Sequence, residues 1–124
     1  MTSPTARTLS WCKKQGFIPQ VVEKYNQFSM KRIDLFGIID IVAITPVCIL
    51  GIQTTSRANM NARIKKALAE PRLFAWLRAG GKFEVHGWSK KGKRNERKLW
   101  KLTREVFVKE EDSVRNYREA DDVE

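Results

Sequence analysis

The chain has 124 residues and a formal net charge of +10. This length fits one domain, and a hydrophobic fraction of 42% is enough for one core and argues against wholesale disorder. No apolar run approaches the roughly 20 residues of a membrane span, and no apolar segment follows a charged one at the start, so we expect neither a membrane protein nor a secretory signal. Cys12 and Cys48 lie in apolar settings, and we expect them to be small core residues in a reducing, cytoplasmic compartment.

The charge is unevenly distributed along the chain. Residues 110–124 contain seven acids against Arg115 and Arg118, so the remaining 109 residues carry 22 Lys and Arg against seven acids, a balance of +15. Such a body attracts polyanions, nucleic acid first, although a basic surface that serves only solubility is the alternative. We expect residues 1–109 to form the domain and residues 110–124 to be a disordered acidic tail that shields the basic face or solubilises the protein.

The first half of the chain predicts one helix followed by three strands. The helix covers residues 4–15, with Thr5 as a candidate cap and Gly16 at its end. The predicted strands are 17–25, 31–44 and 47–55, with a turn at 26–29 and an interruption of the second strand near Gly37. Only Thr45-Pro46 separates the last two apolar runs, so these two strands should form an antiparallel hairpin.

The second half predicts a helical segment and two further strands. Met60, Ile64 and Leu68 recur at helical spacing, Pro71 starts a second helical stretch, and Gly80-Gly81 ends it. Strands at 82–88 and 99–108 enclose a basic turn at 89–97. The order α-β-β-β-α-β-β predicts an α/β fold: one small domain with a mixed central sheet flanked by helices.

Asp40 and Gln53 are the most informative residues. Each lies in an apolar run that predicts a buried strand, and a carboxylate in such a run is costly unless something pairs with it. The predicted hairpin brings the two residues together. Thr55 shares the face of Gln53, while Thr54 points to the opposite face. A buried Asp beside a polar oxygen, in a very basic protein, indicates a divalent metal that faces a phosphate.

Only three acids occur in the first 69 residues: Glu23, Asp34 and Asp40. All three fall on predicted strands, where charge is usually avoided. Asp40, the amide oxygen of Gln53 and the backbone carbonyl of Thr54 offer hard oxygen ligands for Mg²⁺ or Mn²⁺, with Glu23 as a further carboxylate and Asp34 as an additional candidate. The alternatives are ordinary ones: Asp40 paired with a buried Arg, Asp34 in a turn, Glu23 facing solvent, and Gln53 and Thr55 as polar residues of an edge strand.

These residues resemble the PD-(D/E)XK nuclease superfamily. The similar part is Gly37-Ile38-Ile39-Asp40, a two-residue turn, and a strand that ends in Gln53-Thr54-Thr55. The resemblance covers roughly residues 5 to 108 and implies a restriction-endonuclease-like core. It also implies that Asp40 is the first metal-binding acid, that Gln53 stands at the second acid position, that Thr55 stands at the position of the family's Lys, and that Glu23 completes the site.

The resemblance implies a Mg²⁺- or Mn²⁺-dependent DNA endonuclease of phage or bacterial type, with duplex, branched or single-stranded DNA as substrate and a homodimer as one assembly. Gln53 brings no charge and Thr55 cannot replace the Lys, so a cation from the following helix is expected to do so. The candidates are Arg63, Lys65, Lys66 and, at its start, Arg57. The alternative is a catalytically inactive DNA-binding module with the nuclease fold, and a basic protein bound to RNA is a third reading. Candidate nucleic-acid contacts are Lys31, Arg32, Arg57, Arg63, Lys65, Lys66, Lys90, Lys91, Lys93 and Arg94.

His86 is the only histidine of the chain, and its predicted strand places it on one face with Glu84 and Trp88. A lone histidine can act as a general base, but it is more often a hydrogen-bonded structural residue. Both roles remain open from the sequence.

Overall fold

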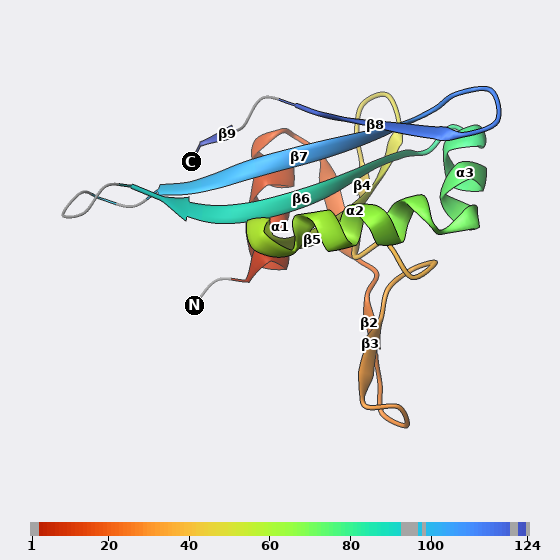
Figure 1. Cartoon of the computed structure of the whole chain (residues 1–124). Helices are drawn as coiled ribbons and strands as arrows, with labels where there is room; N and C mark the ends of the chain where they lie inside the picture. The colour runs from red at the N-terminus through yellow and green to blue at the C-terminus, as the bar shows by residue number, and fades with distance from the viewer. Residues whose placement is uncertain (1–2, 93–96, 98, 120–121, 124) are drawn as a thin grey trace.

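A mixed β-sheet with helices on both faces forms the body of the protein in the computed structural model (Figure 1). The structure describes residues 3–92, 97, 99–119 and 122–123. The elements are α1 (Pro4–Lys14), β1 (Ile18–Val21), β2 (Lys24–Asn26), β3 (Lys31–Ile33), β4 (Ile41–Ile44), β5 (Ile49–Ser56), the 3-10 turn η1 (Arg57–Asn59), α2 (Met60–Leu68), α3 (Pro71–Arg78), β6 (Lys82–Lys91), β7 (Leu99–Lys109), β8 (Val114–Arg118) and β9 (Asp122–Val123).

The main sheet has the strand order β1-β4-β5-β6-β7-β8, and β9 pairs with β7. The β5–β6 pair is parallel and the other pairs of this sheet are antiparallel. A parallel pair needs a crossover, which η1, α2 and α3 supply. The predicted α/β class with a mixed sheet is therefore confirmed, and so is the β4–β5 hairpin. Among the described residues, no helix has the length and apolar character to cross a membrane.

Two apolar clusters lie on opposite faces of the sheet. On one face, Met60 and Ile64 of α2 and Leu73 of α3 pack against Phe83 and Phe107. Ala67 continues the buried stripe of α2, whereas the predicted member Leu68 is 44% exposed. These contacts fix α2 on the face of the sheet where Gln53 of β5 and Arg63 of α2 line one depression.

On the other face, Trp11 and Cys12 of α1 pack against residues of β4, β5 and β6, including Ile52 and Trp88. The side chain of Ser3, not Thr5, caps α1, since its hydroxyl accepts a hydrogen bond from the amide of Ala6. The helix contains Pro4 at its start, and the chain leaves it through Gly16 at φ +81°. Cys12 is buried as predicted, but Cys48 lies half-buried in the β4–β5 turn instead of the core.

The predicted strands 17–25 and 31–44 are each divided in two. β1 and β4 pair in the main sheet. Within the described part of the chain, β2 and β3 pair only with each other, in a two-stranded hairpin that projects from the body (Figure 1). The break in 31–44 occurs at Phe36 and Gly37, where φ is +55° and +74°. An extended chain cannot continue through such angles, so the predicted interruption near Gly37 is confirmed and the single long strand is wrong.

The C-terminal segment is also different from the prediction. Residues 114–118 form β8, which pairs with β7, so the prediction of a wholly disordered tail over 110–124 is wrong. The buried carboxylate of Glu105 accepts hydrogen bonds from Asn116 Nδ2 at 2.6 Å and from Arg118 Nε at 3.0 Å. The seven acids of residues 110–124 favour disorder in the sequence pattern, whereas Val114–Arg118 contains no acid and forms the strand.

This pairing predicts that residues 110–124 stabilise the domain. Their removal should lower the free energy of unfolding by about 3 kcal/mol, because β7 loses its pairing with β8 and Glu105 loses the hydrogen bonds from Asn116 and Arg118. Urea unfolding of the full and shortened chains measures the difference. Glu105→Gln in the shortened chain should recover part of the loss, since a neutral amide is less costly to leave unpaired. An unchanged unfolding midpoint on shortening would show that the segment does not hold β7.

Candidate metal centre

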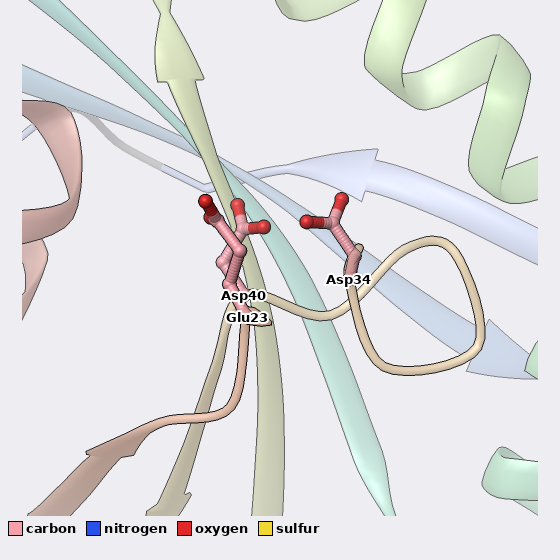
Figure 2. Close-up of side chains that lie close together, drawn as sticks. All are labelled: Glu23, Asp34 and Asp40. Carbon is pink, nitrogen blue, oxygen red and sulfur yellow. The ribbon is translucent and has the colours of Figure 1, made fainter. Parts of the chain in front are cut away.

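Three carboxylates gather where the β2–β3 hairpin leaves the main sheet. Oxygens of Glu23, Asp34 and Asp40 lie within 4.8 Å of one another, and their side chains point toward the same space (Figure 2). Glu23 lies between β1 and β2, Asp34 follows β3, and Asp40 precedes β4. The sequence placed all three on strands, whereas the structure places each at a strand end, where a charged side chain need not face a packed sheet.

The backbone of Asp40 ties two strands of the main sheet together. Its carbonyl accepts the amide protons of Val22 at 2.9 Å and Glu23 at 3.3 Å, and its own amide donates to the carbonyl of Ile52 at 2.9 Å. The end of β1 is therefore held against Asp40 on one side while β5 is held on the other. This arrangement brings Glu23 beside Asp40.

A short closed loop brings Asp34 to the same place. The amide of Gly37 donates to the Asp34 carbonyl at 3.0 Å, and the amide of Leu35 donates to the Ile39 carbonyl at 2.9 Å. The left-handed conformations of Phe36 and Gly37 make this tight reversal possible. From the sequence, Asp34 is only an additional candidate. The signal that indicates its role is Gly37 between Asp34 and Asp40, because a glycine there favours a tight loop with both acids at its base.

The carboxylate of Asp40 is 3% exposed and accepts three hydrogen bonds on Oδ2. The donors are Gln53 Nε2 at 2.7 Å, the Thr54 amide at 2.8 Å and the Thr54 hydroxyl at 3.2 Å. The predicted proximity of Asp40 and Gln53 is confirmed. Thr54 contacts Asp40 through its amide and hydroxyl groups rather than its carbonyl, and its hydroxyl also shares a hydrogen bond of 3.0 Å with Thr5 of α1.

Burial and neighbouring acids raise the pKa of Asp40 to about 8. Loss of hydration is the largest cause, followed by a hydrogen bond with the carboxyl of Asp34 and by the negative charges of Asp34 and Glu23, while the hydrogen bond from Thr54 acts in the opposite direction. A proton therefore relieves the crowding of the three acids near neutral pH. A divalent cation bound among the acids would relieve the same crowding with two positive charges, and it would have to displace this proton.

Gln53 is buried beside the acids and has an unusual orientation. Its Nε2 donates to Asp40 and, at 3.3 Å, to Asp34 Oδ2, whereas its Oε1 is buried and has no hydrogen-bond partner among the described residues. Buried amide oxygens are nearly always paired. Ligation of a metal through Oε1, as the sequence predicts, requires a half-turn of the amide that exchanges Nε2 and Oε1. A cation among the acids would favour this half-turn, because it attracts Oε1 and repels the amide protons.

Basic side chains surround the acids. A depression of about 480 Å³ is lined by the three acids together with Gln53, Thr55, Arg32, Arg63 and Lys66. Arg63 and Lys66 lie three residues apart on α2, so they share a face of that helix. Arg32 Nη1 is 2.9 Å from Glu23 Oε1. Of the cations predicted at the following helix, Arg57 and Lys65 do not line this depression.

The remaining predicted cations lie elsewhere. Lys31 is exposed on β3, and Lys90 and Lys91 are exposed on β6. Arg57 and Lys91 line a separate depression of about 210 Å³ with Lys101 and Arg118. Lys93 and Arg94 lie outside the described residues.

His86 is fully buried on the α1 face of the sheet and does not line the depression at the acids. Its Nδ1 lies 3.3 Å from the Thr8 hydroxyl, and its Nε2 lies 2.9 Å from Glu84 Oε1. The ring of Trp11 meets it edge-on at 4.9 Å between centroids. This environment favours the structural role over the general base.

The site thus combines carboxylate oxygens, which are the ligands that hard divalent cations prefer, with basic side chains that can contact an anion. Both line the same depression. Comparison with protein-family models, curated proteins and solved structures finds no match to the chain. What the chain can do is therefore inferred from these residues and their contacts.

The pKa of Asp40 makes the stability of the metal-free protein depend on pH. Because the folded chain holds this proton up to about pH 8 and an ordinary Asp loses it near 3.8, Asp40 contributes stability that is fully present below pH 3.8 and is lost progressively as pH rises to about 8. Urea unfolding in a chelator, from pH 5 to pH 8, should show the wild type losing stability relative to Asp40→Asn. A constant difference between the two proteins across this range would contradict the assignment.

Proposed function

We propose that the chain is a divalent-metal-dependent DNA endonuclease that hydrolyses phosphodiester bonds. The observation that carries the proposal is one depression that contains both the acids and the basic side chains of α2. A carboxylate cluster alone repels a nucleic-acid backbone, and basic residues alone only bind it. The acids with a bound divalent cation, and the basic residues beside them, would together supply the groups that phosphodiester hydrolysis needs.

The donor set fits Mg²⁺ or Mn²⁺. Asp40, Asp34 and Glu23 supply hard oxygens, and the negative charges of Asp34 and Glu23, which help to raise the pKa of Asp40, would favour a cation there. The buried Oε1 of Gln53 would become a further donor after a half-turn of its amide. A divalent cation bound there would polarise the phosphate and activate a water molecule. The three carboxylates would hold it, and Arg32 would keep Glu23 in position through its ion pair.

The basic residues of α2 account for the cation that the third-strand motif lacks. Thr55 lines the depression but carries no charge, while Lys66 and Arg63 reach the same depression from the helix. We therefore assign to Lys66 and Arg63 the binding and charge stabilisation of the phosphate. The resemblance to PD-(D/E)XK nucleases supports this assignment, because that family uses a Lys next to its metal-binding acids.

A second candidate is a DNA-binding module with an inactive site. The orientation of Gln53 favours it, because the amide nitrogen donates to both Asp40 and Asp34 and so closes a network without a metal. DNA would then bind through the same basic residues. Cleavage distinguishes the two candidates.

The nuclease proposal predicts metal-dependent cleavage that Asp40→Asn abolishes. The assay uses supercoiled plasmid, linear duplex, single strand and a four-way junction with Mg²⁺ or Mn²⁺. Lys66→Met should slow cleavage by about a hundredfold, as expected for the loss of one charge-stabilising group, while Lys65→Met should change it little.

Lys65 is the matched control because it is exposed on the same helix but does not line the depression. Binding without cleavage of any substrate by the wild type would support the inactive module instead. Equal losses in Lys65→Met and Lys66→Met would show that only the overall charge of α2 matters.

A further inference from the structure

The β2–β3 hairpin, residues 24–33, forms an arm outside the main sheet. Its strands pair in the register Lys24↔Ile33, Tyr25↔Arg32 and Asn26↔Lys31, and neither strand pairs with another strand among the described residues. Figure 1 shows the arm projecting away from the body. A two-stranded hairpin of this length contributes little to the core, so its projection needs another explanation.

The tip of the arm has a defined conformation. The side chain of Asn26 accepts hydrogen bonds from the amides of Phe28 at 2.9 Å and Ser29 at 3.2 Å, and Met30 has a φ of +57°. The hydroxyl of Tyr25 lies 3.3 Å from Met30 Sδ across the hairpin. These contacts hold the turn with the side chain of Phe28 100% exposed.

The surface of the arm is both apolar and basic. Tyr25, Met30 and Ile33 are 55%, 73% and 51% exposed, so four large apolar side chains face solvent within ten residues. A cluster of this kind on a projecting element indicates an interaction site. The same ten residues contain Lys24, Lys31 and Arg32 and no acid, so the complementary partner is negatively charged.

Aromatic and basic side chains together fit nucleic acid. An exposed ring stacks on a base or enters between two bases, while nearby cations contact the phosphates. A second copy of this chain fits less well, because the exposed Lys24 and Lys31 of two facing arms would repel one another.

The position of the arm connects it to the acids. Glu23 immediately precedes the arm and Asp34 immediately follows it, so both ends of the arm lie at the candidate metal centre. From Glu23 to Phe28 the chain advances five residues, or at most about 16 Å in extended form. This distance corresponds to roughly five stacked bases along one strand.

We propose that the arm inserts Phe28 between bases of a DNA molecule whose backbone lies at the acids, and that the protein thereby selects DNA with unpaired or unstacked bases over continuous duplex. This inference rests on the proposed DNA binding and names the class of DNA that the site accepts. Opening a continuous duplex costs unstacking energy, whereas a bulge, junction or single strand offers the gap already. The arm acts in recognition and touches no reacting atom.

The test compares two fluorescent duplexes of equal length, one continuous and one with a central three-nucleotide bulge that contains 2-aminopurine. Binding is measured in a chelator, so cleavage cannot contribute. The wild type should bind the bulged duplex about tenfold more tightly and change the 2-aminopurine fluorescence. Phe28→Ala should remove the preference and the fluorescence change, with less than about a twofold effect on the continuous duplex, and Phe28→Trp should retain both.

Val47→Ala is the matched control, because Val47 is 88% exposed in the β4–β5 turn on the body of the protein. An unchanged preference in Phe28→Ala, an equal loss in Val47→Ala, or a wild-type dimer that Phe28→Ala dissociates would overturn the inference. Cleavage with Mg²⁺ by the wild type, together with an unchanged preference in Phe28→Ala, would refute base recognition by the arm and leave the nuclease proposal standing. A Phe28-dependent preference without cleavage would refute the nuclease proposal and leave base recognition by the arm standing.

Discussion

The mutual repulsion of Glu23, Asp34 and Asp40 is the constraint on which the rest of the site depends. Two carboxylates at this separation repel by about 3 kcal/mol at the effective dielectric constant of a protein surface, and Asp40 is almost fully buried. Hydrogen bonds from Gln53 and Thr54 to Asp40 offset part of this cost. A proton on Asp40 near neutral pH removes one of the three negative charges. A set of groups that is held together against its own repulsion is poised to bind a cation.

The surrounding fold keeps the acids together and leaves room beside them. α2 packs against β6 and so brings Lys66 and Arg63 to the depression, while the β4–β5 hairpin fixes Gln53 next to Asp40. The β2–β3 arm begins and ends at the acids, so a partner bound along the arm reaches them. The segments to which we assign metal binding, phosphate binding and base recognition are thus adjacent in the structure.

The sequence predicts those parts of the fold and site that depend on local pattern. Periodicity and turn residues predicted α1, the β4–β5 hairpin and the helices that connect β5 and β6, and the two buried polar residues predicted the contact of Asp40 with Gln53. The arm was missed because β1 and β2 read as one continuous strand, and nothing in the local pattern of Val21-Val22 shows that the chain changes sheets there. β8 was missed because its stability comes from tertiary contacts of Arg118 with Glu105.

The measurement that tests the central claim most directly is thermal unfolding of the wild type and Asp40→Asn with and without Mn²⁺ at neutral pH. Metal bound among the acids at a hundred times its Kd should stabilise the wild type by about 2.7 kcal/mol and leave Asp40→Asn unchanged. Glu110→Gln, which removes an exposed carboxylate that pairs with Arg115, should respond like the wild type. An unfolding temperature of the wild type that does not respond to the metal, or an equal shift in Asp40→Asn, would contradict a metal centre at these residues.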